Sequence, residues 1–410
     1  MIDSCVVIGA GIAGVNAAEA LREKGFEGTV TMIGAEHHQP YDRPPLSKKF
    51  LLDNGTPPDF PLRPQTFYDD CRIDLRLGAE STKLDVSSGA VVLDDGTHVH
   101  ADKVVLATGG RPRRLGLPGC ELVGVHSLRT VDDAAAIRGH LDRGSAVAVI
   151  GGGFIGTEVA AAAAAVGCPV TLIETERLPM QRALGTEVAS LLSRAHRQRG
   201  VILRTGVGVD RLTGRGSVTG VELTDGSHIP AELVVVGVGM VPNVELAAAA
   251  GLVVSEGVRT DQYGRTSHPA IFAAGDVAEQ AGIGRLEHWQ QARDGGGRVA
   301  HAILGQPSPE TPMPWFWSDQ FDLNIQLAGT PSPSDSKCWR GDPDALKFSV
   351  LYHQGRHVTG IIAVNRGKDV RPAIELIKLG SVVDSDLLDD PATPVRAILK
   401  ATRGSVAGST

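Results

Sequence analysis

The sequence predicts an α/β fold with two similar halves, because one short glycine motif recurs with the same surroundings. The motif GxGxxG occupies residues 9–14 and again residues 151–156 of the 410-residue chain. Each copy follows a short apolar run and precedes an alanine-rich stretch typical of a helix. Strand, glycine turn and helix in this order open a dinucleotide-binding βαβ unit, where the helix N-terminus meets a pyrophosphate. The repeat therefore predicts two dinucleotide sites on two Rossmann-like domains.

Each half opens with the same order of predicted elements: strand, glycine loop, helix and strand. In the first half the strands and the helix are residues 5–8, 15–24 and 29–33; in the second they are residues 147–150, 157–166 and 169–173. Because the plan recurs only once, at a long interval, we interpret it as a repeat of domains rather than as a solenoid.

Later in each half, a buried-type strand ends in small residues. Residues 104–106 lead into Thr108 and Gly109, and residues 234–236 lead into Gly237 and Gly239. Small residues at the carboxyl end of a parallel strand let a cofactor approach the sheet, although an ordinary strand-to-loop turn has the same appearance. Their recurrence at matching places favours the cofactor interpretation.

The last third of the chain contains a break rich in proline. A strand at 271–274 runs into Gly275 and Asp276 and is followed by a predicted helix at 290–304. The prolines at 307, 309, 312 and 314 exclude a helix and mark a domain boundary. Strand patterns at 348–353 and 358–364, followed by helical patterns, predict a small α+β domain.

The composition is that of an ordinary globular protein and argues against a binder of nucleic acid or membrane surfaces. The chain is 42% hydrophobic and 21% charged, with a net charge of −7, whereas such binders depend on basic clusters. No apolar run reaches the roughly 18 residues of a spanning helix, and no signal-peptide pattern is evident, so we expect a cytoplasmic protein. The five cysteines are far apart and odd in number, which favours neither a disulfide framework nor a metal site.

Six short segments together carry a resemblance to a known family. With both glycine motifs and the strand ends at 107–110 and 274–276, the chain resembles the two-dinucleotide flavoproteins related to glutathione reductase. The runs PYDRPPLSK at 40–48 and WFWSDQ at 315–320 narrow the resemblance to the putidaredoxin reductase-like, oxygenase-coupled ferredoxin reductases, and more distantly to apoptosis-inducing factor.

The resemblance implies a domain plan and an activity. It implies an FAD-binding domain of residues 1–113 and 241–314, an inserted NAD-binding domain of residues 114–240, and a C-terminal domain of residues 315–410. The implied enzyme is an NADH-dependent flavoprotein ferredoxin reductase with tightly, non-covalently bound FAD. NADH gives a hydride to flavin N5, and single electrons pass to a 2Fe-2S ferredoxin that serves a cytochrome P-450 or a ring-hydroxylating oxygenase.

The path of the electrons follows from a missing feature. Disulfide-using relatives carry a redox cysteine pair, or one active cysteine, beside the flavin, whereas this chain has Ser47 and Lys48 in that region. The cysteines also lack CxxC or CxxxxC spacing, so a dithiol relay is not expected. Electrons should leave the flavin directly.

The first glycine loop is assigned to the FAD pyrophosphate through Gly9, Gly11, Ala13 and Gly14. The acid that usually binds the ribose is displaced: Gly34 stands at its position, so either the Glu36 side chain or backbone groups bind the ribose. The resemblance implies further FAD contacts from Arg43, Thr82, Thr108, Gly109, Arg129, Asp276, Trp289 and Trp317. Alternatively, Asp276 is a helix cap, and Trp289 and Trp317 are core aromatics.

The second loop is assigned to NADH. Its pyrophosphate contacts are Gly151, Gly153, Ile155 and Gly156, and Gly237 and Gly239 leave room for the nicotinamide. Glu174, at the end of the next strand, suits both ribose hydroxyls and repels a 2′-phosphate, which predicts NADH over NADPH. Arg177 and Arg182 lie nearby in the sequence and would favour the phosphate.

Lys48 and Glu158 are the candidate catalytic residues. A cation near flavin N5 and O4 stabilises the reduced ring, and the resemblance implies that Lys48 faces Glu158 and that the pair orients the nicotinamide. The alternatives are a solvated surface lysine and a glutamate favoured by the helix dipole.

The partner implied by the resemblance is a 2Fe-2S ferredoxin, and such ferredoxins are generally acidic. Because this chain is itself net negative, docking needs a local basic face, with Arg63, Arg293 and Arg298 as candidates near Trp317. Scattered solubilising charges are the alternative. Two other functions stay open: a rubredoxin, dye or oxygen reductase of the same fold, and a redox-responsive interaction protein like apoptosis-inducing factor.

Overall fold

The computed structural model describes residues 2–52, 60–307 and 313–407. They form two compact units: residues 1–44, 55–111 and 240–312, and residues 45–54, 112–239 and 313–410. Each unit contains one five-stranded parallel sheet behind a glycine loop, so the predicted α/β class with two Rossmann-like domains is confirmed. The predicted domain boundaries stay predictions, and residues 308–312 of the proline-rich break lie outside the described residues.

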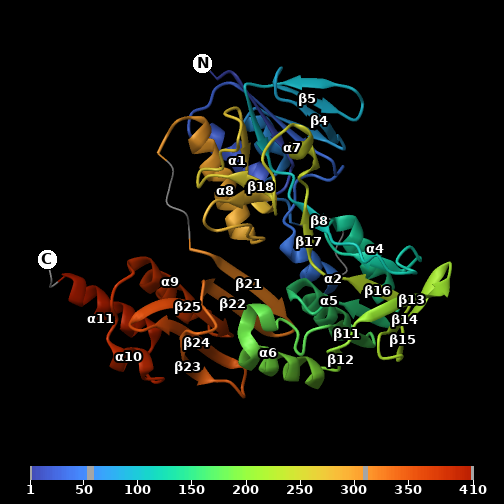
Figure 1. Ribbon diagram of the computed structural model, residues 1–410, viewed down its shortest axis with the longest axis vertical. Coiled ribbons are helices and arrows are strands. Elements are labelled where there is room, and N and C mark those ends of the chain that lie inside the picture. Colours follow the sequence, from blue (N-terminus) through green and yellow to red (C-terminus); the bar gives the residue numbers. More distant parts are fainter. Residues whose placement is uncertain (1, 53–59, 308–312, 408–410) are drawn as a thin grey trace. The chain divides into compact units, whose positions relative to one another are not determined.

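The first unit is built on a parallel sheet with the strand order β19-β7-β1-β2-β3. These strands are β1 (Ser4–Ile8), β2 (Thr29–Gly34), β3 (Ile73–Leu77), β7 (Lys103–Leu106) and β19 (Ile271–Ala273). Helices α1 (Ile12–Glu23) and α8 (Trp289–Ile303) pack against each other on one face of the sheet (Figure 1). The predicted helices at 15–24 and 290–304 are confirmed, and α1 begins three residues earlier than expected.

The two faces of β1 show why this central strand is a continuous apolar run. Cys5 and Val7 belong to the core shared with α1 and α8, whereas Val6 and Ile8 belong to the core on the other face. Successive side chains of a strand point to opposite faces, so a strand covered on both sides reads as a continuous apolar run. The second face is covered by a three-stranded antiparallel sheet of β4 (Ser81–Asp85), β5 (Ala90–Leu93) and β6 (His98–His100), and by α7 (Glu245–Ala249).

Smaller elements complete the first unit. They are α3 (Gln65–Asp70), β18 (Val258–Thr260), the 3-10 turn η2 (Gly275–Val277), β20 (Ala278–Gln280), and the paired strands β8 (Gly110–Pro112) and β17 (Met240–Pro242).

The second unit repeats the parallel plan, with the strand order β12-β11-β10-β16-β9. The strands are β9 (Val125–Ser127), β10 (Val147–Ile150), β11 (Val170–Glu174), β12 (Ile202–Thr205) and β16 (Leu233–Val236). Its helices are α4 (Val131–Leu141), α5 (Phe154–Ala165) and α6 (Gln181–Gln198). An antiparallel sheet of β13 (Val209–Arg215), β14 (Ser217–Leu223) and β15 (His228–Pro230) is attached, and the short η1 (Pro44–Ser47) and α2 (Lys49–Leu52) precede the first gap.

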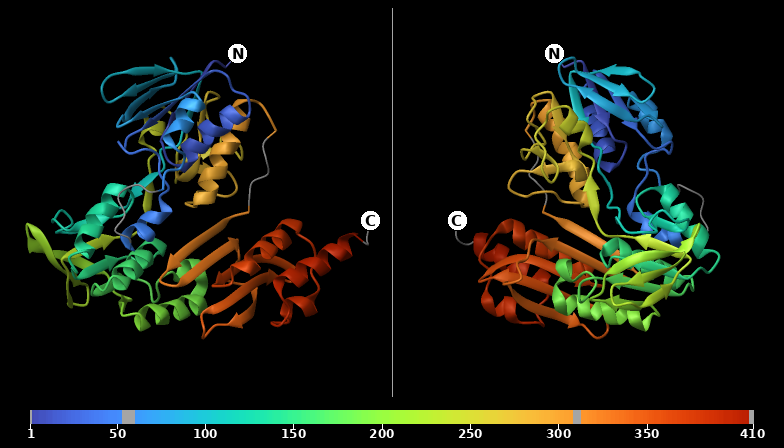
Figure 2. Two further views of the ribbon diagram at one scale, coloured as in Figure 1. Left: turned by 180° about the vertical axis from the view of Figure 1, so that it is seen from behind. Right: turned by 45° about the vertical axis from the view of Figure 1, so that its right-hand side comes forward.

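The predicted C-terminal α+β region is confirmed as an antiparallel sheet with helices (Figure 2). Its strands are β21 (Trp315–Gln320), β22 (Leu323–Gly329), β23 (Ser336–Asp342), β24 (Lys347–Gln354) and β25 (His357–Val364). Helices α9 (Val370–Leu379), α10 (Ser385–Asp389) and α11 (Val395–Ala407) follow, with the short η3 (Gly367–Asp369) before them. One face of the sheet packs on α9 to α11 and the other on α6, so this region shares an apolar core with the helix α6 that follows the second parallel sheet's β11.

Within the described ranges, no helix has the length and apolar character that crossing a membrane requires.

The contact between α1 and α8 depends on one glycine. A Cβ atom at Gly296 of α8 would lie 2.2 Å from Ala13 O and 2.9 Å from Ala17 N of α1, so the two backbones touch there. At the adjacent Gly297, a Cβ would meet nothing within 4 Å.

We therefore predict opposite effects for two neighbouring substitutions. Gly296→Ala should lower the free energy of unfolding by about 1–3 kcal/mol, because the helices must separate to admit the methyl group. Gly297→Ala should raise it by roughly 0.5–1 kcal/mol, since alanine loses less backbone entropy in a helix. Urea unfolding of both variants measures the difference, and equal midpoints would show that the close approach is not a constraint.

Candidate active site

The two glycine loops have the same backbone geometry. Gly9 has φ +115° and Gly151 has φ +102°, a region that favours glycine. A Cβ at Gly9 would lie 2.1 Å from Ala107 O, and one at Gly151 would lie 2.4 Å from Gly237 O. Both loops therefore press against the end of the neighbouring parallel strand, which brings the predicted segments 107–110 and 237–239 to the predicted sites.

The helices that follow the loops have N-termini suited to an anion. The N-caps of α1 and α5 are Gly11 and Gly153, without a side-chain cap or an acid in the first turn. By contrast, Thr130 and Asp133 form a capping box at the start of α4. A Cβ at Gly11 or Gly153 would meet nothing within 4 Å. The first N–H groups of α1 and α5 thus border open space, an arrangement that fits a pyrophosphate in each unit.

The remaining loop positions serve packing. Gly14 and Gly156 let the helices touch the loops, since a Cβ there would lie 1.9 Å from Gly9 O and 2.0 Å from Gly151 O. Ala13 is buried against α8, whereas Ile155 is 48% exposed.

The displaced acid of the first half has a steric cause. A Cβ at Gly34 would lie 2.7 Å from the Ala10 Cβ, so no side chain fits at the usual position of the acid. Glu36 instead pairs with Arg43 (Oε1 to Nη2, 2.8 Å) and accepts a hydrogen bond from the Tyr41 hydroxyl (2.5 Å). The structure therefore brings Glu36 and Arg43 together and adds Tyr41, which the sequence analysis did not select.

Other predicted FAD contacts of the first unit are held by residues that the motifs did not reveal. Thr108 donates its hydroxyl to Asn243 O (2.9 Å), and the Asn243 amide donates to Thr108 O (2.9 Å), which fixes the strand end before Gly109. The Trp289 indole donates to Asp42 (2.6 Å). Asn243 and Asp42 are far from these partners in the sequence, so local patterns gave no signal for either pairing, although Asp42 stands in the run at 40–48.

The four remaining predicted FAD contacts lie on different elements. Asp276 is half-buried in η2, and Thr82 is exposed on β4, where its hydroxyl donates to Val92 O (3.2 Å). Arg129 directly precedes the N-cap of α4, and the Trp317 ring stacks on that of Trp315 with centroids 5.1 Å apart. Their contacts with a cofactor stay predictions.

The acid predicted to select NADH lies beside the second loop. Glu174 ends β11, and its carboxylate accepts hydrogen bonds from Gly152 N (2.7 Å) and Glu176 N (2.8 Å). Arg182 pairs with Glu176 (2.5 Å), so this cation is balanced by a second acid. A Cβ at Gly237 would meet its nearest atom at 3.7 Å and one at Gly239 nothing within 4 Å, which leaves open space at the end of β16.

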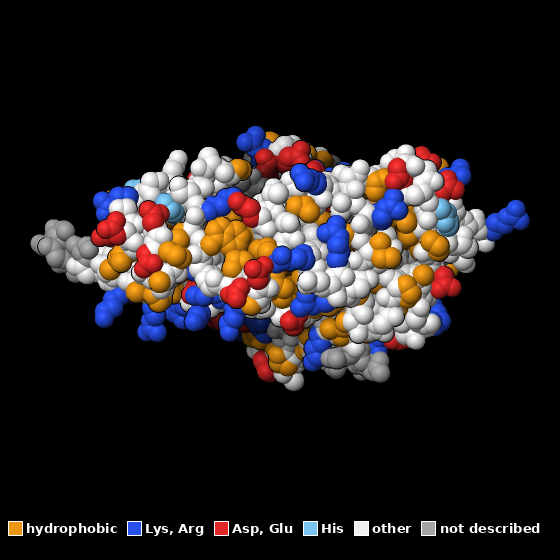
Figure 3. All heavy atoms as spheres, turned by 90° about the horizontal axis from the view of Figure 1, so that it is seen from below, with side chains coloured by type: hydrophobic (Ala, Val, Ile, Leu, Met, Phe, Trp, Pro, Cys, Tyr) orange, Lys and Arg blue, Asp and Glu red, His pale blue; other side chains and the backbone are white. Residues whose placement is uncertain are grey.

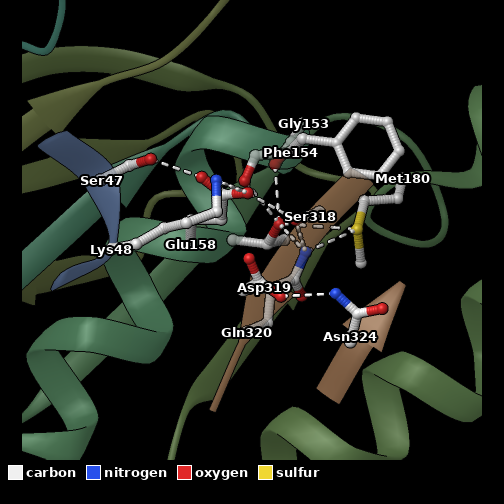
Figure 4. Close-up of polar contacts among 11 residues, drawn as sticks. Ser47, Lys48, Gly153, Phe154, Glu158, Met180, Ser318, Asp319, Gln320 and Asn324 are labelled. Atoms are coloured by element: carbon white, nitrogen blue, oxygen red, sulfur yellow. Dashed lines mark hydrogen bonds and ion pairs between the residues drawn. The ribbon is translucent and has the colours of Figure 1, made fainter. Parts of the chain in front are cut away.

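Lys48 and Glu158 form a buried ion pair within the second unit (Figure 4). Lys48 Nζ lies 2.9 Å from Glu158 Oε1, and Glu158 is only 4% exposed. The Ser47 hydroxyl donates to Oε2, and the Ser318 hydroxyl donates to Oε1 (2.5 Å). Three donors thus compensate the desolvation of this carboxylate, as a buried charge requires. The predicted pairing is present, and Ser47 and Ser318 extend it.

One of the three arginines predicted to form a basic docking face, Arg298, is buried, so its assignment is wrong. Arg298 is 6% exposed, so it cannot meet a partner surface; it lines a small cavity with Asp261 and Gln291, and burial lowers its pKa. An arginine on a helix looks the same in a sequence whether its face is covered or not. Arg63 pairs with Glu19 and Arg293 with Asp294. On the face seen in Figure 3, Lys and Arg side chains are interspersed with Asp and Glu.

Comparison with known proteins covers almost the whole chain. Residues 3–296 match the family model described as pyridine nucleotide-disulphide oxidoreductase, and residues 315–399 match the one described as reductase C-terminal. The chain is 40% identical to the ferredoxin–NAD(+) reductase component of the p-cumate 2,3-dioxygenase system of Pseudomonas putida, over 96% of this chain and 98% of the relative. It is 42% identical to the corresponding component of the anthranilate 1,2-dioxygenase system of Burkholderia cepacia, over 97% and 99%.

Solved structures give the same result. The covalent putidaredoxin reductase–putidaredoxin complex includes a chain with a TM-score of 0.93 at 34% identity, over 98% of this chain and 99% of that one. A ferredoxin reductase from Rhodopseudomonas palustris has a TM-score of 0.92 at 36% identity, over 98% and 100%. The recognition made from the motifs is confirmed: the chain belongs to the pyridine nucleotide-disulphide oxidoreductase family.

Proposed function

We propose that this protein is an FAD-dependent NADH:ferredoxin reductase, which supplies electrons to a 2Fe-2S ferredoxin of a cytochrome P-450 or ring-hydroxylating oxygenase system. One observation carries the proposal: two glycine loops of equal geometry open onto free space in a chain that matches ferredoxin–NAD(+) reductase components over its length. The competing functions are a rubredoxin, dye or oxygen reductase and a redox-responsive interaction protein.

The residues of the first unit would hold FAD without a covalent bond. The N–H groups at the start of α1 meet the pyrophosphate, and the Glu36–Arg43 pair offers an acceptor and a cation beside it. Thr108, Gly109, Asp276 and Trp289 are proposed to line the rest of the cofactor, with Thr82 near the adenine. Arg129 and Trp317 are the two further FAD contacts that the family resemblance implies. Bound FAD supplies the ability to take two electrons together and release them singly.

The residues of the second unit would hold NADH. The start of α5 meets the pyrophosphate, and the open space at Gly237 and Gly239 suits the nicotinamide. The Glu174 carboxylate is held by backbone N–H groups and keeps acceptor capacity for two ribose hydroxyls, while its charge repels a 2′-phosphate.

Lys48 and Glu158 are proposed to act on the hydride-transfer step. The carboxylate holds the Lys48 ammonium in one place, so that its charge favours electron density on a nearby ring, and the pair orients the nicotinamide. The cysteines lack CxxC or CxxxxC spacing, and Cys5, Cys168 and Cys338 are buried, which supports direct one-electron exit rather than a dithiol relay. The proposed docking face keeps Arg63 and Arg293 and loses Arg298.

The electron acceptor is tested by NADH-driven reduction of cytochrome c with and without a 2Fe-2S ferredoxin. We expect the rate to depend strongly on the ferredoxin, because the flavin then passes electrons through its natural carrier. A rate that ignores ferredoxin would favour a dye, rubredoxin or oxygen reductase. Slow turnover with a long-lived charge-transfer complex and NADH-dependent dimerisation would favour the interaction protein.

The choice of coenzyme is tested at Glu174. The unmodified enzyme should have a higher kcat/KM with NADH than with NADPH. Glu174→Ala should lower kcat/KM for NADH about ten- to a hundredfold, because hydrogen bonds to a charged group contribute about 1.5–3 kcal/mol. Glu176→Ala, two residues away, is the matched control and should keep the NADH value. Comparable kcat/KM for both coenzymes in the unmodified enzyme would contradict the assignment.

The role of Lys48 is tested with Lys48→Met. The substitution should slow flavin reduction by NADH about ten- to a hundredfold, the scale of one hydrogen bond to a charged group, and lower the flavin midpoint potential. The neighbouring Lys49, exposed on α2, provides the control Lys49→Met, which should change neither quantity. An unchanged rate and potential in Lys48→Met would remove this lysine from the mechanism.

A further inference from the structure

Strand β21 sends two polar side chains into the interior of the second unit. Ser318 and Gln320 are both 0% exposed and reach α5, whereas Trp315 and Trp317, at alternate positions, stack on each other. Two residues on the same face of a strand are separated by one position, so Ser318 and Gln320 act from one side of β21. Figure 4 shows both beside Glu158.

The hydrogen bonds of these residues form a chain that ends at His196. Gln320 Nε2 donates to Ser318 Oγ (3.0 Å) and to Thr157 Oγ1 (3.0 Å), and Gln320 Oε1 lies 2.8 Å from His196 Nε2. The Ser318 hydroxyl in turn donates to Glu158. The chain thus runs from α6 through β21 to the carboxylate on α5.

Counting protons fixes the direction of every bond. The single hydroxyl proton of Ser318 goes to the carboxylate, so Ser318 Oγ must accept from the Gln320 amide. The Gln320 amide nitrogen therefore faces Ser318 and Thr157, with Met180 Sδ as a third, weak acceptor at 3.3 Å, and its Oε1 accepts a hydrogen bond from His196 Nε2. The histidine is therefore the donor that sets the orientation of the amide.

The surroundings of His196 agree with a neutral ring that carries its proton on Nε2. The side chain is 1% exposed, and burial lowers its pKa. Its Nδ1 atom has no hydrogen-bond partner among the described residues. A proton on Nδ1 would leave a buried N–H unsatisfied, which costs more than an unfilled lone pair.

We infer that Ser318 and Gln320 are positioning residues for the Lys48–Glu158 pair, with His196 fixing the orientation of the Gln320 amide. Ser318 and Gln320 hold the Glu158 carboxylate in one rotamer, so the Lys48 ammonium that pairs with it is held in one position. The inference rests on the proposed role of that pair in NADH oxidation. Its consequence is that the C-terminal region contributes to the reductive half-reaction through a strand that makes no proposed contact with NADH.

The test separates positioning from packing. Ser318→Ala and Gln320→Met should shift the flavin midpoint potential in the same direction as Lys48→Met, by a smaller amount. They should also slow flavin reduction about two- to tenfold, the scale of one net hydrogen bond, with KM for NADH nearly unchanged. Ser349→Ala is the matched control. Ser349 lies on β24 of the same sheet, is also 0% exposed, and donates to the buried carboxylate of Asp369 (2.8 Å).

His196 supplies a rescue experiment. His196→Gln retains an N–H donor near the position of Nε2 and should keep the potential and rate of the unmodified enzyme. His196→Phe fills the space without a donor and should behave like Gln320→Met.

The outcomes are distinguishable from failure of the proposed function. If Ser318→Ala and Gln320→Met lower only the melting temperature, as Ser349→Ala would, the residues are structural and the inference is overturned. Potentials and NADH reduction rates are measured without ferredoxin, so a missing ferredoxin dependence would refute the proposed acceptor while these readouts still decide the positioning role.

Discussion

Both proposed cofactor sites depend on close contact between the backbone of a glycine loop and the backbone of a neighbouring strand, which leaves no room for a Cβ atom. In each unit the loop backbone touches the end of a neighbouring strand, and the following helix touches the loop, at distances that exclude any side chain. This contact aims the start of α1 or α5 at open space, where its uncompensated N–H groups can meet an anion. The strand ends at Ala107 and Gly237 meet the loops at these points, and Glu174 accepts a hydrogen bond from Gly152 N of the second loop.

Sequence patterns predicted what is local in the chain. The strands, glycine loops and first helices were predictable because apolar runs and glycine spacing act over a few residues, and the fold class followed from their repetition. Glu36, Arg43, Lys48 and Glu158 were found through motifs, and the structure pairs them as Glu36 with Arg43 and Lys48 with Glu158. The partners that complete these pairs, such as Ser318, lie up to 160 positions away, and a single sequence contains no signal for such distances.

The burial of charged and polar side chains was the second property that the sequence analysis could not predict. Arg298 was assigned to a docking surface because arginine is normally exposed, yet its side chain is covered by the loops packed on α8. His196 was not selected, although it ends a hydrogen-bonded chain that reaches the Glu158 carboxylate. Whether a polar side chain is covered depends on tertiary packing, which helix periodicity does not specify when the covering segments are loops.

Because the side chains of β21 alternate between two faces with different contacts, both faces depend on one register of the strand. The strand is paired with β22 from Trp315 to Gln320, and odd positions carry the stacked indoles while even positions carry the serine and glutamine that reach α5. A slip of one residue would exchange the two faces completely, turning an indole toward the buried carboxylate and the serine away from it. An insertion or deletion within β21, or in the short turn to β22, would therefore move the stacked indoles and the serine that binds Glu158 together, so neither face of the strand can change its register alone.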